Sequence, residues 1–440
     1  MEDAIEGLRH LYEGLREKDL VSTGQAQVEL WQPVLTPIDG VDRAAPATED
    51  EALERVHQSL TDAGLKFSHR TVQAVHTALK VTEESPLLVL AGISGTGKSE
   101  LPRRYAEAMG IHFLPVPVQP RWDSPQDLFG FFNYLEGRYR PTELTRALLQ
   151  MDPVGPEPGR GWRPDADAYT PLDNEMLLVL FDEMNLARVE YYFSELLSRL
   201  EMRRGLDRAD QQHRGQVEIP LEVGRGGQAS ASGSSIDEAK TQAILRLLVG
   251  TNVLFVGTMN EDESTQTLSD KVIDRSNLLR FGRPAKLRID APVEETRSPV
   301  AGALDFATWH RWLRQPSNLV EDLAEQMEEW IQRTNAALQS VGRPFAFRVH
   351  RAIKAYVVNY PQQDDQGVRR AMADQIEFRI LPRLRGLDPQ EQVVQQTLET
   401  LVRMVGDDLA DERLAEAIQA SRAAHPHQFA WMGLDRSSEG

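Results

Sequence analysis

The sequence predicts an α/β fold, in which a parallel sheet is flanked by helices, together with a separate all-helical region. Apolar runs at residues 86–91, 176–181 and 252–258 lack the alternation of a half-exposed strand, so each is expected to be buried on both faces. Helical patterns separate the first runs, and this order favours parallel strands joined by helices. From Pro292 onward, apolar residues recur at helical spacing.

Three regions follow from this pattern. Residues 1–66 are predicted to be a helical N-terminal segment and linker, because apolar residues recur at helical spacing over 5–15 and residues 32–50 are rich in Pro, Asp and Ala. Residues 67–290 are predicted to form the large α/β domain. Residues 291–440 are predicted to form a helical lid domain with a C-terminal tail.

The sequence predicts the order of elements in the large domain. We expect a helix at 70–81, a strand at 86–91, a helix at 98–109, and further strands at 112–118, 176–181, 252–258 and 286–289. Loops are expected at 155–167 and 224–235, where Gly, Pro, Ser and Ala accumulate. In the lid, helical stripes predict a core that includes Trp309, Trp312, Met327, Trp330 and Ile331.

Composition excludes several classes of function. The chain has no cysteine, so disulfides, Cys-ligated zinc and thiol catalysis are excluded. A net charge of −18 repels nucleic acid over most of the surface, so DNA contact is expected only through a complex. No apolar stretch approaches the ~20 residues of a membrane span. The N-terminus does not resemble a secretory signal, and we expect a cytoplasmic location without membrane contact.

A phosphate-binding loop is the strongest chemical signal. It fits the pattern GxxxxGK[ST] and comprises Gly92, Ile93, Ser94, Gly95, Thr96, Gly97, Lys98 and Ser99. The glycines let backbone N–H groups surround phosphate oxygens, and the helix that follows adds its positive end. Lys98 is expected to reach the β- and γ-phosphates, and the Ser99 hydroxyl to bind Mg²⁺. The loop predicts a nucleoside triphosphate as ligand.

Acidic and amide residues at two strand ends complete the pattern. Asp182 and Glu183 directly follow the strand at 176–181, where Asp182 would hold Mg²⁺ through water and Glu183 would act as general base. The alternative is a pair of acids that merely ends a strand. Asn260 ends the strand at 252–258 and would orient the attacking water, as a sensor 1 residue. Asn also ends strands as a turn former, which is its structural alternative.

These residues, in this order, resemble the AAA+ superfamily, and four segments resemble its McrB-like group, the motor subunits of modified-cytosine restriction systems. The segments are DEMNLARVEYYF at 182–193, GTMNEDEST at 257–265, QPRWDSPQDLFG at 119–130 and ILPRLRG at 380–386. The resemblance covers residues 67–390. It implies a homo-oligomeric ring, usually of six subunits, with Mg²⁺-dependent active sites between neighbours.

The resemblance also implies roles for two arginines. Arg275 lies shortly after Asn260, where AAA+ proteins carry an arginine finger that reaches the neighbour's γ-phosphate. A salt bridge with Asp274 is the alternative. Arg348, at the start of a predicted lid helix, is the candidate sensor 2 residue that contacts nucleotide. Arg351 is its rival, and a surface salt bridge is the structural alternative.

Departures from the restriction type modify these expectations. Residues Glu261-Asp262-Glu263 replace the Thr-Ala-Asp-Arg run of GTP-using members, which favours ATP, with GTP as the alternative. No DNA-recognition domain is recognisable before residue 67. The expected function is the ATPase motor of a multi-subunit complex for anti-phage defence or DNA restriction, with a nuclease or effector partner. The alternatives are a MoxR-like protein-remodelling ATPase and a nucleotide-dependent switch that barely turns over.

Overall fold

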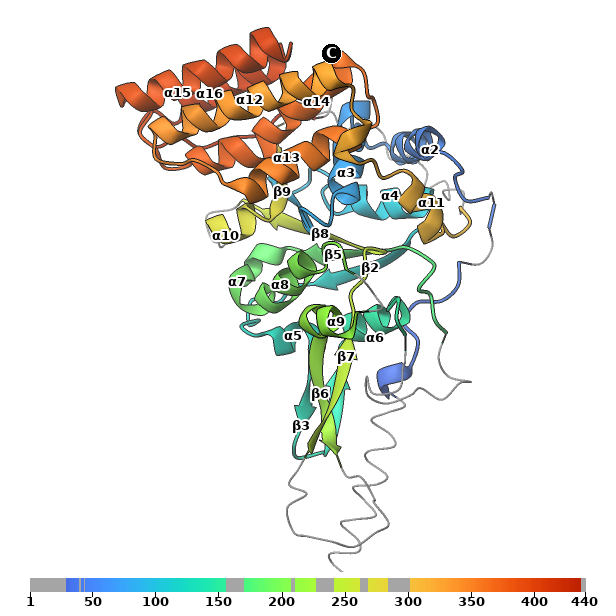
Figure 1. Ribbon diagram of the computed structural model, residues 1–440. Helices are drawn as coiled ribbons and strands as arrows, with labels where there is room; N and C mark the ends of the chain where they lie inside the picture. Colours follow the sequence, from blue (N-terminus) through green and yellow to red (C-terminus); the bar gives the residue numbers. More distant parts are fainter. Residues whose placement is uncertain are drawn as a thin grey trace, which may run out of the picture. The chain divides into compact units, whose positions relative to one another are not determined.

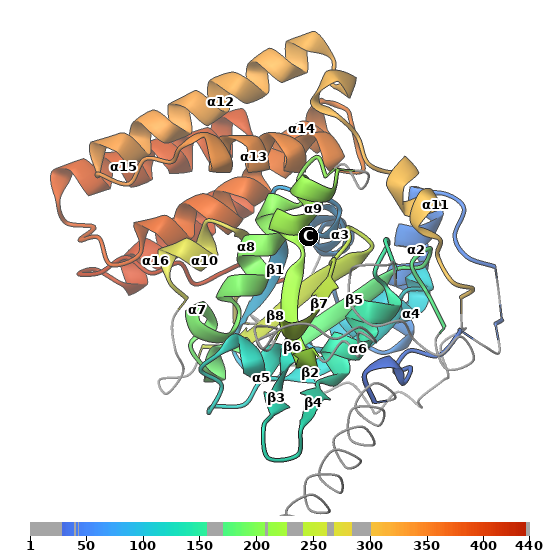
Figure 2. The same cartoon turned by 60° about the horizontal axis from the view of Figure 1, so that its bottom comes forward.

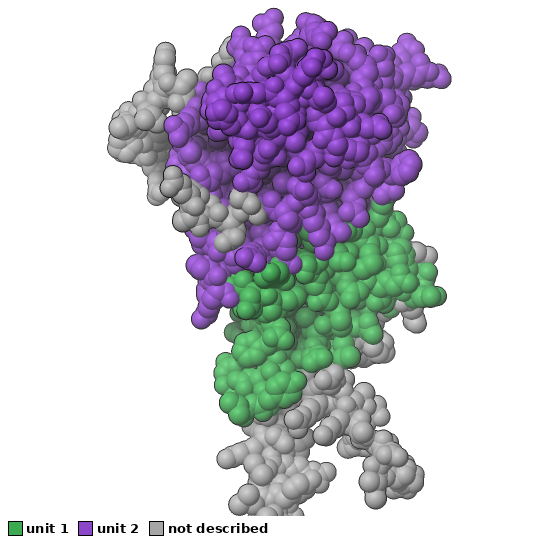
Figure 3. Space-filling model, turned by 90° about the vertical axis from the view of Figure 1, so that its left-hand side faces the viewer, with its two compact units in different colours: residues 1–37, 122–174, 191–253 green, residues 38–121, 175–190, 254–440 purple. Residues whose placement is uncertain are grey.

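The computed structural model describes most of the chain as two compact units (Figure 3). The described residues are 29–38, 41–42, 44–155, 170–206, 210–226, 241–261, 268–283 and 301–436. Unit 1 comprises residues 1–37, 122–174 and 191–253, and unit 2 comprises residues 38–121, 175–190 and 254–440. The predicted helix at 5–15, the predicted strand at 286–289 and most of both predicted loops lie outside the described residues.

A five-stranded sheet forms the centre of unit 2 (Figure 1). Its order is β2 (His112–Pro117), β5 (Leu177–Asp182), β8 (Val253–Asn260), β1 (Leu87–Gly92) and β9 (Ser276–Phe281). Strand β1 pairs in parallel with both β8 and β9, and β2 pairs in parallel with β5. The predicted fold class, a parallel sheet flanked by helices with a helical C-terminal region, is confirmed.

The strands that could be predicted from the sequence are those that are buried on both faces. All six residues of β1 are buried, as are all but the last residue of β5 and of β8. Strand β9 was not expected from the sequence, because the polar residues Ser276, Asn277 and Arg280 interrupt its apolar pattern. Tertiary contacts compensate for this polarity: Asn277 Oδ1, for example, accepts a hydrogen bond from Gln375 at 3.2 Å.

Helices that flank the sheet begin and end at recognisable residues. They are α2 (Glu49–Asp62), α3 (His69–Lys80), α4 (Glu100–Met109) and α10 (Asp270–Ile273). The side chains of Thr48 and Ser68 accept hydrogen bonds from backbone N–H groups in the first turns of α2 and α3. Gly110 ends α4 in the left-handed conformation at φ 72°, where glycine is least strained.

The helices after residue 320 gather into one bundle, whereas α11 (Phe306–Arg311) lies apart from it, near α2 (Figures 1 and 2). The bundle helices are α12 (Glu321–Ser340), α13 (Phe347–Asn359), α14 (Asp365–Gln375), α15 (Gln392–Arg403) and α16 (Glu412–Ala424), with short turns at Ile376–Ile380, Leu381–Leu384 and Met404–Asp408. A further short turn, Pro316–Asn318, lies between α11 and α12. The predicted lid core is confirmed, since Trp309, Trp312, Met327, Trp330 and Ile331 are all buried. No described helix has the length and apolarity needed to cross a membrane.

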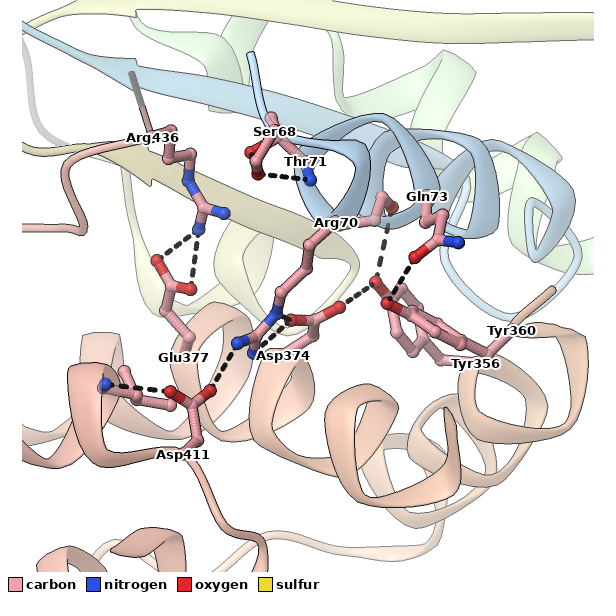
Figure 4. Close-up of polar contacts among 12 residues, drawn as sticks. Ser68, Arg70, Thr71, Gln73, Tyr356, Tyr360, Asp374, Glu377, Asp411 and Arg436 are labelled. Atoms are coloured by element: carbon pink, nitrogen blue, oxygen red, sulfur yellow. Dashed lines mark hydrogen bonds and ion pairs between the residues drawn. The ribbon is translucent and has the colours of Figure 1, made fainter. Parts of the chain in front are cut away.

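A buried polar network ties α3 to this helical region (Figure 4). The guanidinium of Arg70 on α3 pairs with Asp374 on α14 at 2.8 Å and with Asp411 at 2.5 Å. The Tyr356 hydroxyl donates to the second oxygen of Asp374 at 3.0 Å. Burial raises the pKa of Asp374, and Arg70 opposes that rise. The helix that precedes β1 is therefore held to the helical C-terminal region by charge as well as by apolar packing.

Unit 1 is built from two hairpins and several helices. Its elements are α5 (Pro125–Phe129), β3 (Gly130–Asn133), β4 (Arg138–Pro141), α6 (Glu143–Gln150), α8 (Ser194–Met202), α9 (Gln211–Val217), β6 (Ile219–Gly226) and β7 (Thr241–Leu247), and the helix α7 (Val189–Tyr192) spans the sequence boundary between the units. The hairpins β3–β4 and β6–β7 are antiparallel and contact one another.

A second buried cluster of charges holds helix α2 to the rest of unit 2. Glu49 Oε1 accepts hydrogen bonds from Lys80 Nζ at 2.6 Å and from His76 Nε2 at 3.1 Å, and its other oxygen pairs with Arg314 at 3.1 Å. Burial raises the pKa of Glu49, but the combined effect of His76 and Lys80 lowers it from 4.5 to about 2. The Glu49 charge is thus the counterion of a buried lysine.

Removing this counterion should destabilise the fold. We expect Glu49→Gln to cost about 3–5 kcal/mol of unfolding free energy, because it leaves buried Lys80 and its neighbour Arg314 without their shared carboxylate. Because the folded pKa of Glu49 lies below its ordinary value, its contribution is complete above pH 4.5 and is lost as the pH falls toward 2. Urea unfolding at several pH values measures both effects.

The matched control is Glu54→Gln, on the exposed face of the same helix. Its cost should stay within about 0.5 kcal/mol at every pH. The difference between the wild type and Glu49→Gln should shrink in acid. A difference that does not change with pH would contradict the proposed origin of this stability.

Candidate nucleotide-binding site

The predicted phosphate-binding loop connects β1 to α4 and curls around its own lysine. Lys98 Nζ donates to the carbonyl oxygens of Gly92 at 3.1 Å and Ile93 at 2.5 Å, and lies 3.4 Å from the Thr96 hydroxyl. The ammonium is therefore held inside the loop, where an anion bound by the loop would meet it.

Glycine is required at defined points of the loop. Gly92 has φ 142°, and a Cβ atom there would lie 2.6 Å from the carbonyl oxygen of Phe281. Gly97 has φ 81°, and its Cβ would lie 3.0 Å from the ring of Phe67. Both features, a positive φ and a close neighbour, exclude larger side chains. The backbone of the loop therefore approaches β9 and the segment before α3 directly.

Asp182, at the end of β5, joins the loop to the neighbouring strands. Its Oδ1 atom accepts hydrogen bonds from the Ser99 hydroxyl at 2.8 Å and from the Thr258 hydroxyl at 2.6 Å. Ser99 directly precedes α4, and Thr258 lies near the end of β8. Three elements therefore meet at one carboxylate oxygen, as the shared carboxyl edge of parallel strands allows.

Glu183 follows Asp182 in a strained conformation. Its φ is 53°, in the left-handed region that costs a non-glycine residue about 1–3 kcal/mol. The Glu183 N–H donates to the Thr258 hydroxyl at 2.9 Å, and its Oε1 accepts from Asn260 Nδ2 at 2.8 Å. The turn thus directs the carboxylate toward the predicted sensor 1 amide. Strain of this kind concentrates at functional sites.

Two supporting residues were missed from the sequence. Thr258 bridges Asp182 and Glu183, and Asn185 Nδ2 donates to the backbone oxygen of Asn260 at 2.8 Å. Both are buried. A signal for Thr258 existed, because residues two apart on a strand share a face and Thr258 lies two residues before Asn260. No comparable spacing connects Asn185 with Asn260.

The residues present fit Mg²⁺ and a triphosphate. Ser99 and Asp182 bring a hydroxyl and a carboxylate within hydrogen-bond distance of each other, and oxygen ligands of this kind suit Mg²⁺. Among the described residues, no group of three or more His, Asp or Glu side chains could hold a metal ion. Mg²⁺ commonly uses one or two protein oxygens and takes its other ligands from phosphates and water.

Arg275 lies at the other end of the sheet. It directly precedes β9, whose first residue Ser276 pairs with Leu87 at the start of β1, whereas the loop begins at Gly92 at the end of β1. Five residues of strand separate these ends, roughly 17 Å. The alternative partner Asp274 pairs with Arg383 at 2.5 Å. The structure therefore does not bring Arg275 to the phosphate-binding loop of its own chain.

The second candidate arginine, Arg348, belongs to helix α13. It is exposed in the first turn of α13, which confirms the predicted helix start. Its rival Arg351, one turn later, lies 3.5 Å from Glu84, which precedes the start of β1. The structure thus brings together Lys98, Ser99, Asp182, Glu183 and Asn260, and leaves both predicted arginines outside this group.

The bridge through Thr258 can be tested by stability alone. Thr258→Val should cost about 1–3 kcal/mol, because it removes the acceptor of the buried Glu183 N–H and a donor to Asp182. Thr258→Ser keeps the hydroxyl and should recover most of that loss. Denaturant unfolding of the three proteins measures the effect. Destabilisation by Thr258→Ser as large as that by Thr258→Val would contradict this expectation, because the methyl group would then contribute as much as the hydroxyl.

Comparison with known proteins agrees with this geometry. Residues 87–276 match the model of the AAA domain (dynein-related subfamily), and residues 301–425 match that of a domain of unknown function (DUF8727). A search of curated proteins found no match.

Two solved structures are similar over most of the chain. A candidate ATPase from Cytophaga hutchinsonii has a TM-score of 0.43 at 13% identity, covering 74% of this chain and 87% of that one. A full-length MCM homologue from Methanopyrus kandleri has a TM-score of 0.34 at 12% identity, covering 79% of this chain and 63% of that one. The family match falls on residues 87–276, and the five-stranded parallel sheet flanked by helices that this region contributes to is consistent with a P-loop AAA+ core.

Proposed function

We propose that this chain hydrolyses ATP, in preference to GTP, with Mg²⁺. One observation carries the proposal: Lys98, Ser99, Asp182, Glu183 and Asn260 converge at the carboxyl edge of β1, β5 and β8. A set that only ended strands would not require contacts among all three strands and the loop. The preference for ATP rests on the sequence after Asn260, which departs from that of GTP-using relatives.

Each residue has a role that its position supports. The N–H groups from Ser94 to Ser99 and the Lys98 ammonium would bind the phosphates. Ser99 and Asp182 would hold Mg²⁺, which neutralises charge on the β- and γ-phosphates when bound. Glu183 would accept the proton of the attacking water, and the Asn260 amide, 2.8 Å from Glu183, would orient that water.

Arg275 would complete a neighbour's site. Its place at the amino edge of the sheet keeps it from its own phosphate loop, so an action on γ-phosphate requires a second subunit. We therefore propose a homo-oligomeric ring, with six subunits as the expected number. A sensor 2 contact between Arg348, in the first turn of α13, and nucleotide also belongs to this proposal.

The McrB-like segments support a more specific proposal. The chain would be the motor of an anti-phage or DNA-restriction complex, in which a nuclease or effector subunit is the partner and DNA is contacted only through the complex. The region boundaries at residues 66 and 290 belong to this proposal. A MoxR-like protein-remodelling role uses the same catalytic residues and is the second candidate, mildly favoured by the net charge of −18.

Affinity purification from the native host, followed by mass spectrometry, separates these roles. A co-purifying nuclease that stimulates hydrolysis supports the motor role. A protein client or a von Willebrand A-domain protein, without a nuclease, supports remodelling.

Two substitutions test the enzyme itself. Glu183→Gln should bind Mg²⁺–ATP normally and lower kcat by about 10²–10⁴-fold, because it removes the general base but not the phosphate contacts. Lys98→Ala should instead weaken ATP binding by about tenfold or more, a loss of at least ~1.4 kcal/mol. Fluorescent-nucleotide titration and phosphate release measure the two effects. Hydrolysis by Glu183→Gln at the wild-type rate would refute the assigned base.

Subunit mixing tests the arginine. Arg275→Ala should lose about 10³-fold in kcat. Mixed with Glu183→Gln, it should regain activity, because about a quarter of randomly formed interfaces combine an intact Glu183 with a neighbour's intact Arg275. The control is each variant mixed with itself. Failure of the mixture to exceed both variants, despite assembly, would argue against action between subunits.

A further inference from the structure

The C-terminal residues 429–436, here called the strap, lie along the outer side of β9. Leu434 pairs in parallel with Phe281, and the Gly282 N–H donates to the Leu434 carbonyl oxygen at 2.7 Å. Strand β9 is an edge strand of the five-stranded sheet, with β1 on its other side. The strap therefore covers part of an edge that would otherwise present unpaired backbone groups.

Both ends of the strap are firmly held. At its start, Phe429 is buried and exchanges backbone hydrogen bonds with Gly386 at 2.9 Å and Leu387 at 2.7 Å. At its end, Arg436 binds both carboxylate oxygens of Glu377 at 2.6 Å (Figure 4). Glu377 is fully buried, and the Arg436 side chain is 4% exposed. Both hydrogen bonds come from one nitrogen, Nη2, and breaking this buried ion pair would leave a charge without its partner.

Between these anchors, the strap contacts an arginine of β9. Arg280 donates one N–H to the backbone oxygen of Trp431 and forms an ion pair with Glu261 Oε1 at 2.6 Å. Glu261 directly follows the predicted sensor 1 residue, Asn260. The Glu261 N–H also donates to the carbonyl oxygen of Gly92 at 3.3 Å. One arginine thus connects the strap with the end of β8.

Strand order gives this ion pair its significance. Strand β1 lies between β8 and β9, and Gly92 pairs with Asn260 on one side and with Phe281 on the other. An ion pair from the end of β8 to β9 must therefore cross the carboxyl end of β1. That end is where the phosphate-binding loop begins. The Glu261–Arg280 ion pair therefore spans the start of the phosphate-binding loop.

The pair is not buried in a packed core. Glu261 and Arg280 line a cavity of about 760 Å³, together with Ile93 of the loop and Met432 of the strap. Their side chains are 29% and 16% exposed. Substitutions of similar size can therefore be accommodated without crowding, and their effect on the site can be separated from their effect on folding.

We propose that Glu261 and Arg280, held by the strap, are positioning residues for hydrolysis. They fix the end of β8, and with it Asn260, against the start of the phosphate-binding loop. This inference rests on the proposed ATPase activity. Neither residue is assigned contact with nucleotide. Their loss should therefore lower turnover more than binding, because the loop and Lys98 remain while the amide that orients water is displaced.

Three substitutions test the Glu261–Arg280 ion pair together with the strap that holds it, here called the clasp. Glu261→Gln removes the charge, and Arg280→Lys keeps the charge but cannot contact Glu261 and Trp431 together. Gly433→Ala leaves the pair intact but disturbs the strap, since Gly433 has φ 82° and its Cβ would lie 2.7 Å from the Arg280 carbonyl oxygen. We expect a tenfold to hundredfold loss of kcat for the first two and a smaller loss for the third, with KM within threefold.

The double variant Glu261→Gln/Arg280→Lys should be no slower than the worse single variant, because both break one connection. The control is Asp408→Asn, which breaks a 2.8 Å pair with Arg333 in the lid and should leave kcat unchanged. Circular dichroism checks that each protein is folded at the assay temperature, and fluorescent-nucleotide titration measures Kd.

The outcomes are distinct. A wild-type protein that hydrolyses neither ATP nor GTP overturns the proposed function. Normal wild-type turnover with kcat unchanged in Glu261→Gln and Arg280→Lys overturns the clasp alone. So does a parallel loss of ATP binding and kcat in folded variants, since that would make the pair part of the binding surface. Loss of kcat with binding retained, and no additivity, supports it.

Discussion

The site depends on one carboxylate oxygen. Asp182 Oδ1 accepts hydrogen bonds from Ser99 and from Thr258, so the start of α4, the end of β5 and the end of β8 are held at a single point. Thr258 also fixes the backbone of Glu183, whose side chain in turn meets Asn260. Parallel strands make this convergence achievable, because their carboxyl ends share an edge. Without it, the residues from Lys98 to Asn260 that form the site would be scattered along the sequence without a common target.

Local sequence predicts this centre well and its surroundings poorly. Strands β1, β5 and β8 are recognisable because both of their faces are buried, so they contain almost no polar residues. Strand β9 is hidden because Asn277 and Arg280 occupy positions whose partners, Gln375 and Glu261, come from elsewhere in the chain. The role of Asn185 is hidden for the same reason. Residues that bind ligand follow fixed spacing, whereas residues that hold them depend on contacts between distant segments.

Buried charge also links the site to the helical region. Arg70 on α3 meets Asp374 and Asp411, and α3 leads into β1 and the phosphate-binding loop. A buried ion pair adds little net stability compared with apolar packing, since desolvation offsets much of its attraction. Its geometry is nevertheless restrictive, because breaking it leaves a charge without a partner. The strap adds a second such restraint through Arg436 and Glu377. Movement of the helical bundle would therefore displace the elements that carry the phosphate-binding loop.

The position of Arg275 decides what a single chain can accomplish. Charge that develops on the γ-phosphate needs a cation in addition to Lys98 and Mg²⁺ for fast hydrolysis, and arginine fingers supply it. Here that arginine precedes β9 and lies the length of a strand from its own loop. A local rearrangement could not close this gap without unpairing β9 from β1. In the proposed ring, Arg275 would therefore act on another subunit's nucleotide. The catalytic residues of one chain would then belong to two different sites, and assembly would be the step that completes each site.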